Sequence, residues 1–480
     1  TLAQREEGMT DEELAAAKEE LIRSYMKART FSLAEPEIDV SIPDGLAEFE
    51  TAVRASARYD MDTFFLKVAG FGQMGVPAES YAEQRRLDIE VALVLDVSGS
   101  MRGQSAVPVD PDVPSGTKMN KLEAVQSAAT DFVNNLFDDQ EGSQTLVSVV
   151  PYTSNVSANA FMASHFGLQP ITNFLTRHSY SYCFEFETAG DDDSATVLSN
   201  PDYLTVPIDR GAGHQHRQTQ HFANVNDYYA DLYWGGEMRY DCPIAANRVL
   251  PYSNNAGDLT SMINNMAVEN WTSTYTGVKW GAALLDPSSQ PLVQAMIDAN
   301  APTDTRSSEA LDSDYSGWPN EYDDINVHKY LIIMSDGRNS RQHRVVSDAD
   351  YYSPTPDATE AELAVEQAAR MQTWNDTEAW TGDLPYYSTV VNTTEGDALS
   401  EMICDALKDA AGSGNLTIFT IGYDISDETE SGRAAIAVLQ YCATNADSDF
   451  FNITGGDDPA TAFDEIEARL SLLKLTQARR

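Results

Sequence analysis

The sequence predicts an α/β fold, a doubly wound and mostly parallel sheet with long insertions, preceded by a small α/β module. Two apolar runs, residues 91–95 (VALVL) and 330–334 (YLIIM), have the length and composition of strands buried on both faces. Each run ends in a polar loop, and other apolar runs alternate with segments of helical periodicity. This alternation is typical of strands connected by crossover helices.

Residues 1–86 are predicted to form a separate N-terminal unit, a helix followed by a small β module. Thr10 and Glu13 form a capping box that opens a helix ending near Lys27. Two alternating segments predict strands and a third predicts a short helix: residues 37–42, 49–57 and 61–68.

Residues 87–475 are predicted to form the main domain. Besides the two buried strands, the expected elements are helices over residues 118–136, 258–266, 359–371 and 398–411, strands over 147–152 and 416–422, a helix-like stretch through Leu284, and a last helix that starts at Asp458. Three polar segments are longer than ordinary loops and are expected to be insertions, at about residues 154–251, 287–326 and 372–395.

The loop after the first buried strand carries Asp96, Ser98 and Ser100 on one tight turn. One carboxylate and two hydroxyls are hard oxygen donors, which suit Mg²⁺, Mn²⁺ or Ca²⁺ better than zinc or copper. Open α/β sheets bind their ligands at the carboxyl ends of the strands, where this loop is expected to lie. Alternatively, the Asp and Ser side chains cap the following helix or close an Asx-turn.

Two further segments supply candidate partners for this loop. The strand over residues 330–334 delivers Asp336 into a turn, where Gly337 permits tight backbone geometry. Between the two strands lies a hydroxyl-rich loop with Thr272 and Thr274, which leads into the helix-like stretch.

The order of these three elements (Asp-x-Ser-x-Ser, a threonine loop, and a strand ending in Asp-Gly) resembles the von Willebrand factor A domain and its metal-ion-dependent adhesion site. The resemblance implies that Ser98, Ser100 and Thr272 hold one divalent cation directly, Mg²⁺ or else Ca²⁺ or Mn²⁺. It also implies that Asp96 and Asp336 act mostly through water or hydrogen bonds. One position on the ion then stays open for a Glu or Asp side chain of a protein partner.

The threonine role has two candidates in this loop. Both Thr272 and Thr274 fit, and only the spacing to Gly277 favours Thr272, so Thr274 is kept as the alternative ligand.

A narrower resemblance is carried by residues 149–152 (VVPY), 277–281 (GVKWG) and 419–423 (FTIGY), which look like the TadG-like proteins of bacterial tight-adherence (Flp) pilus systems. It implies a role at the bacterial surface, with pilus or filament components, or copies of the chain itself, as partners. In that family an N-terminal membrane helix anchors the protein, and no apolar run of the required length occurs here. We therefore expect membrane attachment only through an anchor upstream of residue 1, and a released or filament-forming relative is equally compatible.

The charge balance excludes some partners. The chain has 75 acidic and 31 basic residues, a net charge of −44, which disfavours nucleic acid and anionic lipid. The acidic runs 191–193 and 323–324 are candidate sites for additional Ca²⁺ within the insertions, with solvated acidic loops as the alternative.

The four cysteines form no C-x-x-C pair, which weakens zinc and redox interpretations. Their arrangement along the chain suggests that Cys183–Cys242 clamps the long insertion and that Cys404–Cys442 ties the last helices together. Such disulfides imply an extracytoplasmic location, at the cell surface, secreted or periplasmic. Four buried free thiols are the alternative.

Enzymatic functions find little support. No G-x-S-x-G elbow surrounds Ser98, and no phosphate-binding glycine loop follows a strand. We therefore expect no enzyme, but an extracytoplasmic adhesion or assembly protein that binds a partner carboxylate through a divalent cation. The alternatives are a structural filament subunit whose insertions make the contacts while the metal only stabilises it, and a hydrolase.

Overall fold

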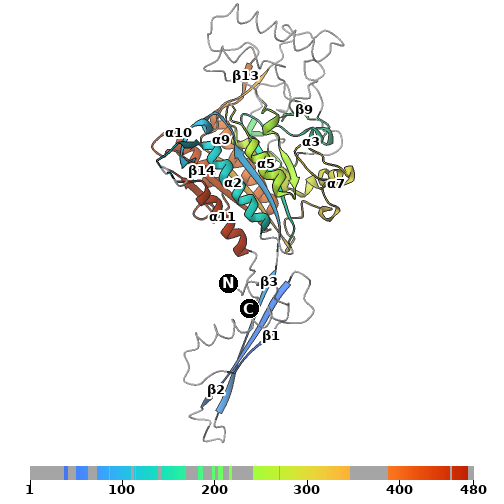
Figure 1. Cartoon of the computed structure of the whole chain (residues 1–480), viewed down its shortest axis with the longest axis vertical. Helices are drawn as coiled ribbons and strands as arrows, with labels where there is room; N and C mark the ends of the chain where they lie inside the picture. Colours follow the sequence, from blue (N-terminus) through green and yellow to red (C-terminus); the bar gives the residue numbers. More distant parts are fainter. Residues whose placement is uncertain are drawn as a thin grey trace, which may run out of the picture. The chain divides into compact units, whose positions relative to one another are not determined.

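The structure is a computed structural model, and it describes residues 37–41, 50–62, 67, 73–85, 87–109, 113, 115–138, 143–168, 182–186, 197–199, 204–208, 216–218, 242–269, 271–345, 387–454 and 457–473. The chain divides into two units, one built mainly from residues 1–87 and the other from residues 88–467 (Figure 1). None of the described helices is long and apolar enough to cross a bilayer.

The smaller unit contains a three-stranded antiparallel sheet in the order β1-β2-β3. Its strands are β1 (Glu37–Ser41), β2 (Glu50–Asp62) and β3 (Gln73–Arg85). The first two match the strands expected from alternation, whereas β3 was not expected. Met61 and Asp62, the start of the predicted short helix, belong to β2 instead, because they pair with Met74 and Gln73 across the hairpin. The helix predicted from Thr10 to Lys27 lies outside the described residues.

The larger unit is built on a six-stranded sheet in the order β10-β7-β4-β11-β14-β15. The strands are β4 (Asp88–Asp96), β7 (Thr145–Tyr152), β10 (Leu250–Ser253), β11 (Val327–Ser335), β14 (Leu416–Tyr423) and β15 (Phe450–Ile453). All neighbours pair in parallel except β10, which runs antiparallel to β7 at one edge. The predicted α/β class with a largely parallel sheet is confirmed.

The strand order reverses between β4 and β11. From β4 the chain proceeds outward to β7 and β10, and from β11 it proceeds the other way to β14 and β15. Crossovers that leave in opposite directions open a crevice at the carboxyl ends of the two central strands, and open α/β sheets bind ligands there.

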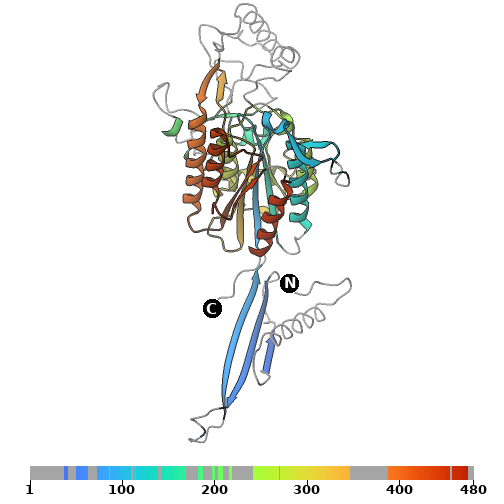
Figure 2. The ribbon, with the colours of Figure 1, turned by 90° about the vertical axis from the view of Figure 1, so that its left-hand side faces the viewer.

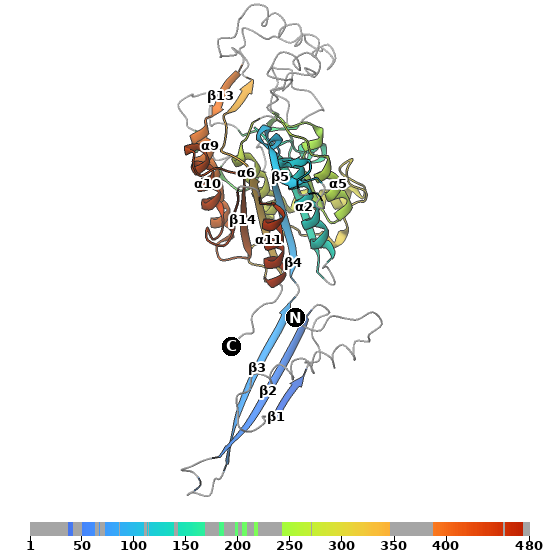
Figure 3. The ribbon, with the colours of Figure 1, turned by 60° about the vertical axis from the view of Figure 1, so that its left-hand side comes forward.

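Helices cover both faces of this sheet (Figures 2 and 3). They are α2 (Lys121–Asp138), α3 (Ala160–His165), α5 (Ala256–Asn265), α6 (Thr274–Leu285), α7 (Gln290–Ala299), α9 (Thr393–Ala411), α10 (Glu430–Cys442) and α11 (Ala460–Leu473). Helix α6 packs on β4, β7 and β11, with α9 against it, while α2 packs on α5. Phe132 of α2 meets Phe463 of α11 at 5.6 Å between ring centroids.

Helix α6 lies unusually close to the sheet because two glycines face it. A Cβ atom on Gly277 would lie 2.7 Å from Val94 Cγ1, and one on Gly281 would lie 2.5 Å from Val94 Cγ2 and 2.6 Å from Leu331 Cδ1. Every residue of α6 is buried, including Trp280. The close packing fixes the start of α6, and with it the threonine loop, at the carboxyl edge of the sheet.

Most elements expected in the main domain are present within one turn or a few residues of their predicted bounds. The segment expected as the polar insertion at 287–326 instead contains helix α7, whose Leu292, Val293 and Met296 are buried. Helix α10 and strand β15 were also not expected. The helix predicted over residues 359–371 and most of the insertion predicted at 372–395 lie outside the described residues.

The remaining described strands form three two-stranded antiparallel sheets: β5 (Gln104–Pro108) with β6 (Lys118–Asn120), β8 (Phe184–Glu185) with β9 (Arg217–Gln218), and β12 (Gln342–Val345) with β13 (Tyr387–Val391). Hairpin β5–β6 connects the first polar loop to α2.

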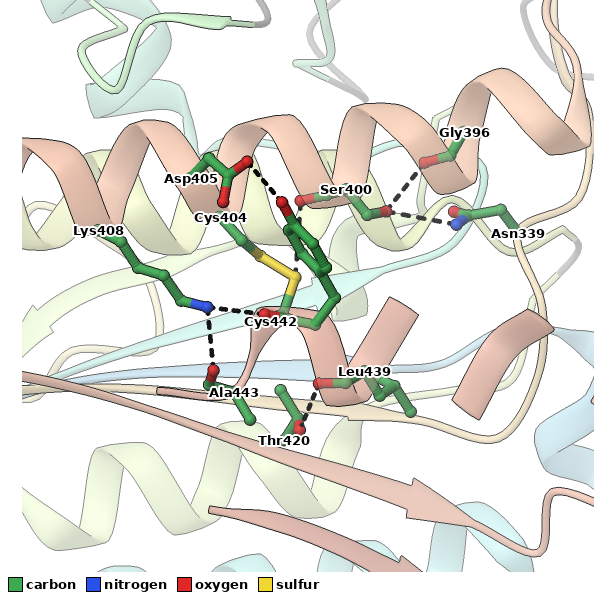
Figure 4. The surroundings of a disulfide bond; sticks show 11 residues. Asn339, Gly396, Ser400, Cys404, Asp405, Lys408, Thr420, Leu439, Cys442 and Ala443 are labelled. Carbon is green, nitrogen blue, oxygen red and sulfur yellow. Dashed lines mark hydrogen bonds between the residues drawn. A yellow bond between two sulfur atoms is a disulfide. The ribbon is translucent and has the colours of Figure 1, made fainter. Parts of the chain in front are cut away.

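Both predicted disulfides are present, Cys183–Cys242 and Cys404–Cys442, and no described cysteine is free. The second joins α9 to the last residue of α10 (Figure 4). Beside it, Lys408 donates to the carbonyls of Tyr441 and Ala443 at 2.7 and 2.9 Å, which caps the end of α10.

Candidate metal centre

The loops that follow β4 and β11 meet at the point where the strand order reverses. The parallel register pairs Met334 with Leu95, so the two strands end side by side. Ser335 Oγ donates to Asp96 Oδ2 at 3.0 Å, and this bond joins the two loops across 239 positions of sequence. The segments that sequence reasoning combined are therefore neighbours in space.

A chain of oxygen atoms links the first loop to Asp336. Ser98 Oγ lies 3.0 Å from Ser100 Oγ, and Ser100 Oγ donates to Asp336 Oδ1 at 2.5 Å. Ser98 is fully buried and Asp336 is 6% exposed. The structure thus brings together four of the predicted ligand residues: Asp96, Ser98, Ser100 and Asp336.

Asp96 is held by several donors on a fully buried carboxylate. The Ser98 N–H donates to Oδ1 at 2.8 Å, which closes the Asx-turn foreseen as an alternative to metal binding. Tyr152 Oη donates to Oδ2 at 3.2 Å. The other alternative, helix capping, does not apply, because the Ser98 side chain makes no capping bond to the short helix over Gly99–Arg102.

Two buried carboxylates share this small volume, and their pKa values reflect it. Burial, followed by the charge of Asp336, raises the pKa of Asp96 to about 7, against hydrogen bonds that lower it. Burial also raises the pKa of Asp336, although the ammonium of Lys121 and the Ser100 hydroxyl oppose that shift. A cation placed between them would relieve this cost.

The threonine loop is fastened to both strand ends. The Glu269 N–H donates to Val97 O at 2.7 Å, and the Thr272 N–H donates to Ser340 Oγ at 2.7 Å. Thr274, on the first turn of α6, donates its N–H to Asn339 Oδ1 at 2.7 Å. Both threonines are buried beside the two loops.

The two threonines are held in different ways. Thr274 begins α6 and lies near Tyr152, whose hydroxyl donates to Asp96 Oδ2 at 3.2 Å and to Met334 O at 3.0 Å. The structure brings Thr272 to the same edge of the sheet through its backbone bonds to Ser340.

Sequence reasoning missed four residues of this centre: Tyr152, Ser335, Lys121 and Asp424. Lys121 Nζ lies 3.2 Å from Asp336 Oδ2 and 3.1 Å from Asp424 Oδ2. Asp424 follows β14, so the rule that located Asp336, an acidic residue directly after a parallel strand, would have found it. No local signal distinguishes Lys121 from other lysines that begin a helix.

The oxygen donors fit a hard divalent cation. Two oxygens that share an octahedral Mg²⁺ lie about 2.9 Å apart, close to the 3.0 Å between the hydroxyls of Ser98 and Ser100. Two carboxylates and several hydroxyls are the donor types that Mg²⁺, Mn²⁺ and Ca²⁺ prefer.

Other metal sites lack comparable support. Among the residues that the structure describes, no group of three or more His, Cys, Asp or Glu side chains is placed to hold a metal ion. The additional Ca²⁺ site expected at Asp323 and Asp324 therefore has no such group around it, and residues 191–193 lie outside the described part. The centre described above depends on hydroxyl oxygens as well as carboxylates.

The base of the long insertion is fixed next to the centre. Buried Glu269, whose N–H bonds the first loop, accepts hydrogen bonds from the Ile244 N–H at 3.0 Å and from Asn247 Nδ2 at 2.6 Å. Fully buried Lys279 of α6 donates to the carbonyl of Thr205. These bonds attach the insertion to the core, and the Cys183–Cys242 disulfide ties two points of the insertion to each other.

No protein-family model and no curated protein matches this sequence. Among solved structures, the open conformation of the pilus adhesin SpaC from Lactobacillus rhamnosus GG superposes with a TM-score of 0.33 at 10% identity, over 91% of this chain and 33% of that chain. A mutant of the PilB minor pilin from Streptococcus sanguinis gives 0.34 at 10% identity, over 93% of this chain and 81% of that chain. The chain thus spans a third of the length of SpaC. Likeness of this extent carries no argument about function.

Proposed function

We propose that this protein is an extracytoplasmic adhesion or assembly protein that binds a divalent cation at the meeting point of β4 and β11, and through it a carboxylate of a protein partner. The observation that carries the proposal is the contact between Ser100 Oγ and Asp336 Oδ1 at 2.5 Å, 236 positions apart in sequence. It joins an Asp-x-Ser-x-Ser loop to a second strand-end aspartate at the position where α/β sheets bind ligands.

The donors divide into two groups by what they contact. The hydroxyls of Ser98 and Ser100 lie 3.0 Å apart, and the Thr272 backbone is bound to Ser340 beside the second loop. Asp96 instead is surrounded by Tyr152, Ser335 and the Ser98 N–H. We assign the hydroxyls and Thr272 as direct ligands, and Asp96 as the charge that orients them. Thr274 remains the alternative ligand, at the first turn of α6.

A bound divalent cation would supply positive charge and an exchangeable coordination position, which suits a Glu or Asp of a partner. Asp96 and Ser98 are fully buried and would form the inner side of the site, whereas exposed Ser100 would leave the outer side of the ion open to the partner. A strongly acidic protein could then attract an acidic group locally.

The two disulfides support a location outside the cytoplasm, because such bonds persist in oxidising compartments. The resemblance of the segments over residues 149–152, 277–281 and 419–423 to TadG-like proteins extends the proposal to a surface pilus or filament system.

Calorimetric titration with Mg²⁺, Mn²⁺ and Ca²⁺ tests the metal centre. We expect one site in the full chain and at least about a tenfold loss of affinity in Asp336→Asn, because a carboxylate that faces the cation becomes neutral. Asp409→Asn, which removes the same charge from an exposed position of α9, is the matched control and should keep the affinity. Absence of any binding by the wild type would refute the proposal.

The proposed role of the partner's carboxylate is tested with two peptides of the same sequence, except that one position is Glu in the first peptide and Gln in the second. Binding of the Glu peptide in Mn²⁺, its loss in excess EDTA, and no binding of the Gln peptide are expected. A metal-binding protein that does not distinguish the peptides would favour the second candidate, a structural filament subunit whose insertions make the contacts. The observation behind that candidate is the attachment of the insertion to the core through Lys279 and Glu269, with Cys183–Cys242 as a cross-link within the insertion.

A further inference from the structure

Lys121 places a positive charge directly at the centre. It is the first residue of α2, and its side chain is 11% exposed. Its backbone N–H donates to Gly103 O at 2.7 Å, which holds the start of the helix against the end of the first loop. A Cβ on Gly103 would lie 3.2 Å from Lys121 Cε, so the glycine leaves room for the lysine stem.

The ammonium of Lys121 lies between two carboxylates of different burial. Asp336 Oδ2, at 3.2 Å, belongs to a side chain with no exposed surface, whereas Asp424 Oδ2, at 3.1 Å, belongs to one that is 51% exposed. Asp424 directly follows β14, the neighbour of β11, and its N–H bonds Ile453 O at 2.6 Å. Its backbone is fixed at φ 55° while its carboxylate reaches toward solvent.

We propose that Lys121 is a tethered cation that neutralises Asp336 in the metal-free protein and is transferred to Asp424 when a divalent ion binds. The inference rests on the proposed metal centre and adds its regulation. Lys121 lowers the affinity of the centre for the ion, and Asp424 reduces this effect by accepting the displaced ammonium.

The physical reason is competition for one carboxylate. An ion that contacts Ser100 and Asp336 would lie within a few ångströms of the ammonium, and the burial of Asp336 and most of Lys121 strengthens the repulsion between the two positive charges. The lysine side chain is long and flexible enough to keep its stem in place while its head moves to the half-exposed Asp424. In the absence of metal, the same ammonium neutralises Asp336, which would otherwise repel the buried carboxylate of Asp96.

The experiment measures Mn²⁺ affinity by calorimetry and thermal unfolding without metal for the full chain, Lys121→Met, Asp424→Asn and the double variant. Lys121→Met should bind Mn²⁺ about tenfold more tightly and should unfold at a lower temperature than wild type without metal. Saturating Mn²⁺ should restore its unfolding temperature. Lys118→Met, which removes a lysine from β6, controls for the general loss of positive charge and should change both quantities little.

The double variant separates the two roles. Asp424→Asn should weaken Mn²⁺ binding in the wild-type background and have little effect once Lys121 is Met, because Asp424 acts through the lysine. An equal loss in both backgrounds would overturn the transfer to Asp424. Unchanged Mn²⁺ affinity in Lys121→Met would overturn the inference while leaving the metal centre intact, whereas no Mn²⁺ binding by any variant would instead refute the metal centre itself.

Discussion

Individual side chains in this protein carry charge into places where water cannot reach. Hydrogen bonds from Ser98, Ser335 and Tyr152 stabilise the ionised form of Asp96. Its pKa nevertheless rises to about 7, because burial has the larger effect. The pKa of Glu269, which lies before the threonine loop, is raised by burial as well. Burial raises its pKa to about 7, although Asn247 and the Ile244 N–H donate to it.

Glu269 gives a pH-dependent stability with a definite sign. Its pKa in the folded chain lies above the ordinary value of 4.5, so the folded state holds the proton more tightly than the unfolded state. The contribution of Glu269 to the free energy of unfolding therefore becomes less favourable as pH rises from about 4.5 to 7, and it stays so above that range. Glu269→Gln removes this penalty, and its free energy of unfolding relative to wild type should rise by about 2 kcal/mol between pH 5 and pH 8.

Urea unfolding without divalent ions at the two pH values checks this expectation. Asp96 titrates in the same range, but it is present in both proteins and cancels from the difference. Glu309→Gln, at an exposed position, should show no such change with pH. A difference between Glu269→Gln and wild type that is independent of pH would contradict the assignment.

Among the elements, α6 decides where the threonine loop lies. Its glycines at positions 277 and 281 let the helix axis approach β4 and β11, and its buried Tyr275 and Trp280 fill the space beside them. Asn339 then receives the Thr274 N–H at the start of the helix. The distance between α6 and the sheet therefore controls the distance between the threonine loop and the two strand ends.

Gly281→Ala tests this close approach. In an ordinary helix, Gly→Ala stabilises by up to about 1 kcal/mol. Here the new methyl group would meet Val94 and Leu331 inside contact distance, so we expect a loss of about 1–3 kcal/mol. Chemical unfolding followed by tryptophan fluorescence measures it, with Ser261→Ala on the exposed face of α5 as control. Stabilisation by Gly281→Ala would show that the helix can move away without cost.

For the larger unit as a whole, the disulfides fasten segments that the sheet does not connect directly. Cys404–Cys442 joins α9 and α10 over a sequence separation of 38, and Cys183–Cys242 joins two points within the insertion over a separation of 59. Cross-links stabilise mainly by restricting the unfolded chain, and by more when the loop is longer.

The double variant Cys404→Ser with Cys442→Ser should lose about 4 kcal/mol of unfolding free energy, as expected for a loop of this length. Guanidinium unfolding measures the loss. Wild type treated with a reductant should lose at least as much, since both disulfides open. A loss near zero would indicate that Lys408, which caps α10 across the same contact, already holds the two helices together.

Much of the candidate centre could be predicted because its signals are local. A buried strand is recognisable from a few apolar residues, and the polar residue that follows it, Asp96 or Asp336, is read at once from the sequence. Helix α7 was missed because its short apolar face lies between polar stretches, and β3 was missed because its sequence gives no clean alternation. Tyr152 was noted only as part of the segment 149–152 that resembles TadG-like proteins, since nothing in the local sequence shows that its hydroxyl reaches Asp96.

The sequence by itself determined the α/β class and the chemistry of the three loops, because apolar runs and loop side chains are local features. It suggested the cysteine pairing, which the structure then decided against four free thiols. Only the tertiary structure decided which strand ends are neighbours. The order of strands in a sheet is set by long-range packing, and it alone places Asp424 and Lys121 beside Asp336. These three charged residues come from distant parts of the chain, and the attraction between them depends on that placement.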